Sequence, residues 1–487
     1  MKHYELPAGT DREQRQQRGV FYTPDSIVDF MVANALHGKQ FPLKICDYSC
    51  GGGAFLAGVL RYFKKHFPEK ASEAARHLYG IDIDPAALQL AKKNVPDIPE
   101  SNFLCADTLH FSLPETEKFD LIIGNPPYRC SGIRNRKNFP AKELQHLKKL
   151  FPHGFEYKMN LFALFIEQAL RIGKECCLIV PDSLLCGRYF SKLRRFITEN
   201  FQISSLWLVE KPSFDAATGN CVILHTGALS SSPVQCGLFR QESTCTSSQN
   251  YFAIDQKTFL QEPRCRFQLA FSPFEYALAR KIIAGSTPLV EYFDFASGII
   301  ARNGKSSLIS IAPSPTSKPG IIYGREILPF EICRQGAFID LTPEKIKSGL
   351  KPERFAAPKI FLRQTGSSLV AASVYEELYA LNNCHVGVRK NDFPLESGTA
   401  LLNSAVLNFI YRYLSGERNR NFAQIDIDIL NTIPLRRSSR FDHFAAACAK
   451  NPALRCQLDQ ESAILYDLSA AELEWIKATL SSGKSSK

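Results

Sequence analysis

The residues best suited to chemistry follow a short apolar run in the first half of the chain. Residues 119–123 are mostly apolar and predict a buried strand, which ends in the sequence GNPPY at residues 124–128. Asn125 can accept a hydrogen bond through its side-chain oxygen. The Pro126 carbonyl can accept another in a direction that the paired prolines fix, and Tyr128 offers a flat aromatic face. The alternative interpretation is an ordinary Pro-Pro turn with a surface tyrosine.

A glycine-rich turn follows an earlier predicted strand. Asp47 stands at the end of that strand, and Cys50 leads into Gly51-Gly52-Gly53 at the start of a predicted helix. Glycines let the backbone approach a ligand closely, and a helix N-terminus favours negative charge. The spacing differs from the GxGxxG dinucleotide pattern. By itself the turn could equally be a tight strand-to-helix connection.

Two further acids end the next two predicted strands. Asp82 is placed to accept hydrogen bonds from both hydroxyls of a ribose, and Asp107 could accept from an exocyclic amine. Asp84 competes with Asp82, but it precedes a proline and is better explained as a helix cap. For each acid the alternative is a solvated helix cap. With Asp47, they describe an adenosine-shaped pocket, and the chain has no GxxxxGK[ST] loop for a triphosphate.

These motifs need a framework of alternating strands and helices. Strands are predicted over 43–49, 77–84, 102–107, 119–125 and 174–185, and helices over 55–67, 85–95 and 159–173. Such alternation is typical of βαβ units with a mostly parallel sheet and helices on both faces. Ligands bind at the carboxyl ends of the strands in these sheets. We therefore predict an α/β, Rossmann-like fold with the unusual residues at one edge.

The second half of the chain lacks the regular alternation of strands and helices predicted for the first half. Residues 230–250 are Ser-rich and polar, and they predict a loop that closes the first domain. Beyond it, segments 358–374 and 377–389 predict strands, and segment 400–414 predicts one helix. We expect a catalytic domain at 1–240, a linker region at 241–266, a mixed α+β domain at 267–436 and a helical tail at 437–487. The last seven residues, SSGKSSK, should be disordered.

Composition sets weaker limits. The chain has 487 residues, 45% hydrophobic and 22% charged, with a net charge of +11 and a pI near 8.9. This balance suits an anionic partner without requiring one. The 15 cysteines form no CxxC pair or Cys/His cluster at zinc spacing, so no metal site is expected. With no signal peptide or membrane-length apolar run, we expect a cytoplasmic protein with reduced thiols.

Taken in order, the motifs resemble those of a known family. GVFYTP at 19–24, DYSCGGGAFL at 47–56, GIDID at 80–84, CAD at 105–107 and GNPPY look like the gamma-class, TaqI-like DNA adenine-N6 methyltransferases. Several segments beyond the linker, such as REILPF and FAQIDIDILNTIPL, look like the C-terminal specificity domain of the same group. The resemblance covers nearly the whole chain. One departure is Tyr48-Ser49 after the glycine-motif acid, where the family usually has Pro-Ala.

The resemblance implies S-adenosylmethionine as the cofactor and assigns residues to its pocket. The implied cofactor-binding residues are Phe21, Tyr22, Thr23, Pro24, Asp47, Cys50, Gly51, Gly53, Asp82, Ile83, Asp107 and Asn125. Thr23 would contact the methionine end of the cofactor or, equally, cap the helix that follows. The implied catalytic residues are Asn125, Pro126, Pro127, Tyr128 and Phe214.

The chemistry implied is methyl transfer to an adenine amine. The lone pair of that amine is delocalised into the ring, and acceptors at Asn125 and Pro126 would localise it. The adenine must leave the duplex, and Tyr128 would stack on it. Phe214, in a loop before a predicted strand, would supply the second stacking face, although it could also be a core residue. Asn125 favours adenine over cytosine-N4, and no Pro-Cys pair supports cytosine-C5 chemistry.

Two rival functions share these motifs. One is an RNA or protein-glutamine methyltransferase with the same NPPY chemistry, which would not need a large second domain. The other is a catalytically silent DNA-binding subunit, which would not need Asn125 and Tyr128. The implied partner is double-stranded DNA, bound by a monomer, and any restriction endonuclease would be a separate protein. Basic residues that could touch DNA, or simply carry surface charge, are Arg302, Lys305, Arg325, Arg363, Arg389 and Arg420.

Overall fold

The chain divides into two compact units. A computed structural model describes residues 23–128, 130–131, 140–156, 159–209, 220–239, 251–269, 272–416 and 424–482. The first unit is Met1–Pro273 and the second is Phe274–Lys487. Across the described ranges, no helix combines the length and the apolar character needed to cross a lipid bilayer.

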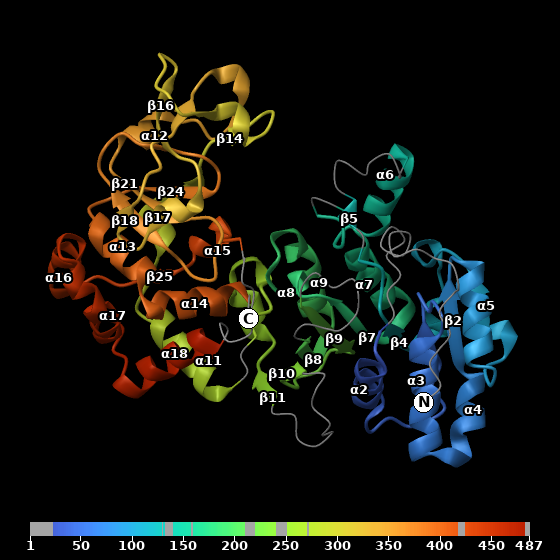
Figure 1. The fold of residues 1–487 in the computed structure, drawn as a ribbon. Helices are drawn as coiled ribbons and strands as arrows, with labels where there is room; N and C mark the ends of the chain where they lie inside the picture. Colours follow the sequence, from blue (N-terminus) through green and yellow to red (C-terminus); the bar gives the residue numbers. More distant parts are fainter. Residues whose placement is uncertain are drawn as a thin grey trace. The chain divides into compact units, whose positions relative to one another are not determined.

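The first unit is built on one large sheet (Figure 1). Its described strands follow the order β11-β10-β8-β9-β7-β4-β1-β2-β3. They are β1 Ile45–Asp47, β2 Leu78–Asp82, β3 Phe103–Cys105, β4 Phe119–Gly124, β7 Gly173–Pro181, β8 Gln202–Val209, β9 Cys221–Gly227, β10 Val234–Phe239 and β11 Tyr251–Ile254. The five strands from β3 to β7 run parallel, whereas β9 is antiparallel to both of its neighbours.

Helices cover both faces of this sheet, as predicted. They include α2 Asp25–Leu36, α3 Ala54–His66, α4 Ala71–Arg76, α5 Pro85–Asn94, α7 Leu161–Ile172 and α9 Ser191–Asn200. Ile123 packs into one buried cluster with side chains of α2, α3 and α5. The side chain of Ile122 points to the opposite face because side chains alternate along a strand, and α7 lies against β4 and β7 there. The predicted α/β, Rossmann-like fold is confirmed.

The predicted loop at 230–250 is wrong in its middle. Val234–Phe239 forms β10, which pairs in parallel with β8, and Gly237 lies directly under the ring of Trp207. The apolar alternation of this strand is short and is masked in the sequence by its Ser-rich surroundings. The predicted linker at 241–266 contains β11 and α10 Lys257–Gln261. Contacts therefore extend the first unit to Pro273, beyond the predicted boundary at residue 240.

The second unit mixes small sheets with helices. One four-stranded sheet has the order β13-β24-β21-β22 and another has β15-β19-β16-β23. Their strands are β13 Phe293–Ser297, β15 Ile309–Ser310, β16 Ser317–Ile321, β19 Phe338–Asp340, β21 Lys359–Arg363, β22 Ala371–Val374, β23 Tyr379–Ala380 and β24 Cys384–Arg389. The strands predicted within 358–374 and 377–389 are confirmed.

The helices of the second unit differ from the prediction at one point. They are α11 Pro273–Ile283, α12 Pro352–Ala356, α13 Leu395–Asn403, α14 Ala405–Ser415, α15 Ile427–Leu430, α16 Ser439–Lys450, α17 Leu458–Leu465 and α18 Ala470–Ser482. The single helix predicted at 400–414 is two helices. Ser404 separates them because its hydroxyl accepts from the Leu407 N–H and caps α14. The helical tail is confirmed, and it packs within the second unit; residues 483–487 lie outside the described ranges.

A truncation tests the revised boundary. Arg194 in α9 is fully buried, and its guanidinium donates to the carbonyls of Arg264 and Cys265. We expect a fragment of residues 1–273 to unfold cooperatively, whereas a fragment of residues 1–240 loses β11 and these acceptors. Arg194 then keeps its hydrogen bonds to the Leu184 and Gly187 carbonyls but loses the other two, which is destabilising for a buried cation. Thermal unfolding followed by circular dichroism should therefore give a clear transition only for the longer fragment; equal transitions would contradict the boundary at Pro273.

Candidate functional site

Four polar side chains gather where four neighbouring strands end. β3, β2, β1 and β4 lie side by side and run parallel. Asp82 and Asp47 are the last residues of β2 and β1, Asp107 follows β3 by two residues, and Asn125 directly follows β4. The carboxyl edge of a parallel sheet is where ligands bind in this fold class. The fold therefore brings the acids and the amide singled out in the sequence to one edge.

The glycine turn connects β1 to α3. Gly51 has a φ of 49° and Gly53 a φ of 84°, in the left-handed region that favours glycine. Gly53 is also the N-cap residue of α3, and a Cβ atom there would lie 3.3 Å from the Cβ of Ala91. Cys50 anchors the start of the turn by donating its N–H to the Ile81 carbonyl at 3.0 Å. This turn thus brings the N-terminus of α3 close to the end of β1.

Asp47 is a buried acid with few compensating contacts. It is 1% exposed, and its carboxylate accepts a hydrogen bond from the Ser49 N–H at 3.2 Å. Burial, with a smaller contribution from the charge of nearby Asp82, raises the pKa of Asp47 to about 8, although the Ser49 hydrogen bond opposes the rise. The carboxylate lies against β4, where a Cβ on Gly124 would be 2.7 Å from its Oδ1. A cation beside Asp47 would restore its charged form.

Asp82 and Asp84 have different roles in the structure. Asp82 accepts from the Gly51 N–H at 2.8 Å and from the Asp84 N–H at 2.9 Å, so it holds the glycine turn to the end of β2. Burial raises the pKa of Asp82, and these backbone hydrogen bonds counteract the rise. Asp84 caps α5 by accepting from the Ala86 N–H at 2.9 Å. The cap predicted for Asp84 is confirmed.

Asp107 lies at the exposed rim of the same edge. It caps a single 3₁₀ turn by accepting from the Leu109 N–H at 3.0 Å, and it contacts His110 Nδ1 at 3.0 Å. The other ring nitrogen of His110 lies 3.2 Å from Glu143 in α6, Ala141–Leu150. A carboxylate has about four lone-pair sites, so capping leaves acceptor capacity for a ligand. Ile83, which follows Asp82, is 68% exposed and offers an apolar surface beside it.

Asn125 has its two amide ends in different environments. Its Nδ2 donates to Thr23 Oγ1 at 3.0 Å. Its Oδ1 is buried and has no hydrogen-bond partner within the described part of the chain. A buried polar atom without a partner carries a desolvation cost unless a ligand supplies the missing bond. Asn125 therefore offers a buried acceptor that a donor on a ligand could satisfy.

Tyr128 is held by its hydroxyl as well as by its ring. The hydroxyl donates to the Ile179 carbonyl at 3.0 Å and lies 3.9 Å from Cys221 Sγ. Burial raises the pKa of the phenol well above its usual value, and the nearby Cys221 adds to this. The ring packs against the core cluster around Ile179 and Trp207 and is partly exposed. Tyr128 is thus an anchored aromatic, with Pro126 and Pro127 between it and Asn125.

Tyr48 and Ser49 depart from the family pattern, and the side chain of Tyr48 lies in the core rather than against the glycine turn. Tyr48 is fully buried, and its hydroxyl donates to the Phe165 carbonyl in α7 at 3.0 Å. Its own carbonyl accepts from Thr108 Oγ1 at 2.5 Å. Ser49 Oγ lies 3.4 Å from the Asn125 carbonyl. Tyr48 therefore fills the core beneath the site, which explains how the turn tolerates a large residue at this position.

Some predicted residues cannot be placed, and some contacts were not anticipated. Phe21, Tyr22 and Phe214 lie outside the described residues. Asn94 supports the glycine turn by donating from its side chain to the Gly52 carbonyl at 2.9 Å, and no motif in the sequence indicates this contact. The Thr23–Asn125 contact was also missed, because it joins residues 102 positions apart.

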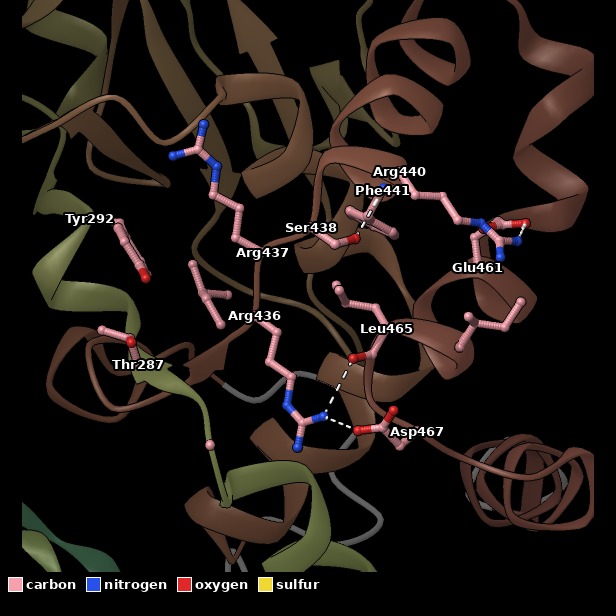
Figure 2. A pocket seen from close by; sticks show the side chains of 13 residues that line it. Thr287, Tyr292, Arg436, Arg437, Ser438, Arg440, Phe441, Glu461, Leu465 and Asp467 are labelled. Atoms are coloured by element: carbon pink, nitrogen blue, oxygen red, sulfur yellow. Dashed lines mark hydrogen bonds and ion pairs between the residues drawn. The ribbon is translucent and has the colours of Figure 1, made fainter.

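The second unit contains a cavity of about 460 Å³ lined by its own residues. Figure 2 shows its lining, in which Arg436 donates to Asp467 and Arg440 donates to Glu461. Arg437 is paired with Asp392 and Asp442. Each of the three arginines is therefore neutralised by a carboxylate, and nothing in the cavity resembles the chemistry at the sheet edge.

The basic residues considered for DNA contacts divide into two groups. Arg302 donates to the carbonyls of Glu344 and Ile346, and Arg363 donates to the Ile327 carbonyl at 2.7 Å. These contacts give both residues a structural role within the second unit. Arg325 stacks over the exposed ring of Tyr323, while Lys305 and Arg389 are exposed. Arg420 lies outside the described residues.

Comparison with known families supports both halves of this description. Residues 96–214 match the Eco57I restriction-modification methylase model, and residues 30–154 match an RMKL-like methyltransferase domain. Residues 320–435 match the TaqI-like C-terminal specificity domain. The first two matches span the sheet edge described above, and the third lies within the second unit.

Curated relatives are similar over part of their length. Type II methyltransferase M.TthHB8I of Thermus thermophilus is 30% identical over 194 residues, which cover 39% of this chain and 40% of that protein. Type II methyltransferase M.CvrRI of Paramecium bursaria Chlorella virus XZ-6E is 25% identical over 218 residues, covering 44% and 49%. The chain therefore spans about half or less of the length of these relatives.

A solved structure extends the similarity in fold to both units. The Type IIL restriction-modification enzyme MmeI, solved in complex with DNA, matches with a TM-score of 0.61 at 13% identity, covering 98% of this chain and 80% of that one. At 13% identity this match shows a similarity in fold alone.

The methylase match implies S-adenosylmethionine as the cofactor, and the sheet edge fits it. Asp47 is a buried acid whose raised pKa favours a cationic neighbour, and Asp82 lies at the strand end that faces a ribose in nucleotide-binding sheets. The left-handed Gly51 and Gly53 let a ligand approach the backbone. In its methylase match and its specificity-domain match, the chain is similar to the TaqI-like restriction-modification methylases.

Proposed function

We propose that the chain is a site-specific DNA methyltransferase that acts on the N6 amine of an adenine turned out of the duplex. The observation that carries this proposal is the buried Oδ1 of Asn125, which lacks a partner within the described residues and lies beside the Pro126-Pro127-Tyr128 segment. An acceptor in this position suits a substrate that brings a hydrogen-bond donor, and an exocyclic amine is such a donor.

The reacting amine would be prepared by two acceptors. Asn125 Oδ1 and the Pro126 carbonyl would each accept one N–H bond of the amine and draw its lone pair out of conjugation with the ring. The prolines hold the carbonyl direction fixed, so little reorganisation is needed at the moment of transfer. When bound, S-adenosylmethionine supplies the methyl group from its sulfonium. No nucleophilic residue takes part, and catalysis consists of positioning and directed dipoles.

Tyr128 would hold the extruded base. Its ring is anchored by the Ile179 hydrogen bond, so it presents one face without losing much side-chain freedom on binding. Stacking of a base on an aromatic side chain is worth about 1–3 kcal/mol. Phe214 remains the candidate for the opposite face.

Each of the three acids would contact a different part of the cofactor. Asp47 would face its cationic methionine end, Asp82 the ribose hydroxyls, and Asp107 the exocyclic amine of its adenine. Ile83 would cover one side of the adenine ring, and Cys50, Gly51 and Gly53 would line the turn. Phe21, Tyr22 and Pro24 would close over the methionine end. The left-handed glycine turn, held by the hydrogen bond from the Gly51 N–H to Asp82, supports this arrangement.

The second unit would read the DNA sequence. Its match to a TaqI-like specificity domain supports DNA as the partner in preference to RNA or a protein glutamine side chain. Incubation of the purified chain with radiolabelled S-adenosylmethionine and duplex DNA, RNA or protein separates these substrates. We expect label in N6-methyladenine of duplex DNA. Label in N4-methylcytosine, in RNA or in protein would overturn the proposal in that part.

Replacing Asp47 with Asn should stabilise the free protein while weakening cofactor binding. The pKa of Asp47 is about 8 in the folded state, which is above its unfolded value. Between roughly pH 4 and 8 the unfolded chain therefore loses the Asp47 proton while the folded protein keeps it, so the free energy of unfolding falls as pH rises. Asn removes that titration. The stability advantage of Asp47→Asn should grow by at most about 1.4 kcal/mol per pH unit over this range.

Urea unfolding at pH 5.5 and 7.5 measures this effect. In a Trp475→Phe background, the buried Trp207 is the remaining tryptophan and reports on the first unit alone. Calorimetry with S-adenosylmethionine on the same proteins gives the loss of affinity. A stability difference that does not change with pH would contradict the raised pKa of Asp47.

Asp82→Ala should weaken cofactor binding more than Asp84→Ala. Asp82 would face the proposed ribose and also holds the Gly51 N–H, whereas Asp84 caps α5. Loss of the Asp84 cap should lower stability by about 1 kcal/mol with affinity largely preserved. Isothermal titration with S-adenosylmethionine compares the two variants, and equal affinities would rule out the ribose role of Asp82.

Asn125→Ala and Tyr128→Ala should fail at different steps. Loss of the Asn125 acceptor should lower kcat by about 10²-fold or more with little change in DNA affinity, by analogy with a removed oxyanion-hole donor. Loss of the Tyr128 ring should also reduce the population of flipped base, which 2-aminopurine fluorescence at the target adenine measures once methylation sequencing has located it.

Tyr128→Phe is the matched control because it keeps the ring. It removes the hydrogen bond to Ile179, so we expect a stability loss of about 1 kcal/mol and a rate near that of the wild type. A Tyr128→Phe protein that folds but is as inactive as Tyr128→Ala would show that the hydroxyl, rather than stacking, matters.

A further inference from the structure

Thr23 makes a contact that neither a helix cap nor a cofactor ligand requires. It is 2% exposed and stands two residues before α2, whose N-cap residue is Pro24. The Pro24 carbonyl accepts the N–H groups of Ile27 and Val28, and no side chain caps the helix. The Thr23 hydroxyl instead accepts from Asn125 Nδ2 at 3.0 Å. The alternative role of Thr23 as a helix cap is therefore wrong.

The orientation of the Asn125 amide decides whether it can help a substrate amine. An amide presents an acceptor at one end and two donors at the other. With Nδ2 bonded to Thr23, Oδ1 is the end left without a described partner. The reversed amide would present N–H donors to a substrate that is itself a donor. Two facing donors repel, so only one of the two orientations is productive.

We propose that Thr23 is a positioning residue, which holds the Asn125 side chain with its oxygen toward the substrate amine. This inference rests on the proposed methyl transfer to an amine. Thr23 Oγ1 gives the buried Nδ2 an acceptor, and without it that donor would be unsatisfied in a buried place, which favours rotation of the amide. The hydrogen bond to Nδ2 also polarises the amide and strengthens Oδ1 as an acceptor.

The backbone of Asn125 is held independently of this contact. Gly124 pairs with Leu178 in β7, and Ser49 Oγ lies 3.4 Å from the Asn125 carbonyl. Loss of the Thr23 hydroxyl should therefore leave the position of Asn125 unchanged and affect the rotation of its side chain. The predicted consequence is a slower transfer step with binding preserved, which a contact to the cofactor would not produce.

The test compares Thr23→Val, which keeps the shape and loses the hydroxyl, with Thr23→Ser, which keeps the hydroxyl. Single-turnover methylation of plasmid DNA at saturating S-adenosylmethionine gives the transfer rate, and titrations give the affinities for cofactor and DNA. We expect Thr23→Val to slow transfer by about 10-fold or more, with both affinities within about two-fold of the wild type. Thr23→Ser should restore most of the rate.

Three results would overturn the inference. Thr23→Val could transfer at the wild-type rate, it could lose cofactor affinity while keeping the saturated rate, or Thr23→Ser could be as slow as Thr23→Val. Trp207 fluorescence in the Trp475→Phe background checks folding of the first unit, and Thr23→Ala replaces Thr23→Val if the latter is unfolded. If the wild-type chain methylates no DNA, the proposed function fails instead, and this outcome is seen before any variant is made.

Discussion

The close approach of the Asp47 carboxylate to Gly124 is the contact on which the sheet edge depends. β1 and β4 are adjacent, and Asp47 Oδ1 occupies the space that any side chain at Gly124 would need. This places a buried acid directly beside the peptide that leads into Asn125. The cationic end of a cofactor and the amine of a substrate would thereby meet at the ends of two neighbouring strands, so sheet geometry sets their separation.

The parts of the fold that the sequence predicted are those with local patterns. The strands ending at Asp47, Asp82 and Gly124 have compact apolar runs, and the intervening helices have clear periodicity, so their order predicts the sheet edge. β10 was missed because its short alternation is flanked by serines. A single helix was predicted at 400–414 because the residues on both sides of Ser404 strongly favour helix. In the structure the Ser404 hydroxyl caps α14, and the segment forms two helices.

The details of the site depend on contacts between distant residues, which one sequence does not reveal. Nothing near Thr23 indicates Asn125, and nothing near Tyr128 indicates the Ile179 carbonyl. The same limit applies to Arg302 and Arg363 in the second unit. As charges in a sequence they are candidates for phosphate contacts, yet their guanidinium groups bond to backbone carbonyls, which only the folded unit brings within reach.

The free protein holds two groups at this edge in states that folding alone does not favour. Asp47 is buried with a raised pKa, and Asn125 Oδ1 is buried without a partner in the described chain. Each costs stability that a suitable ligand would recover, a cation beside Asp47 and a hydrogen-bond donor to Asn125. In a site preorganised in this way, the ligand would supply the charge and the hydrogen-bond donor that the folded chain does not provide. In the arrangement that we propose, Thr23 satisfies the end of the Asn125 amide that the substrate would not use.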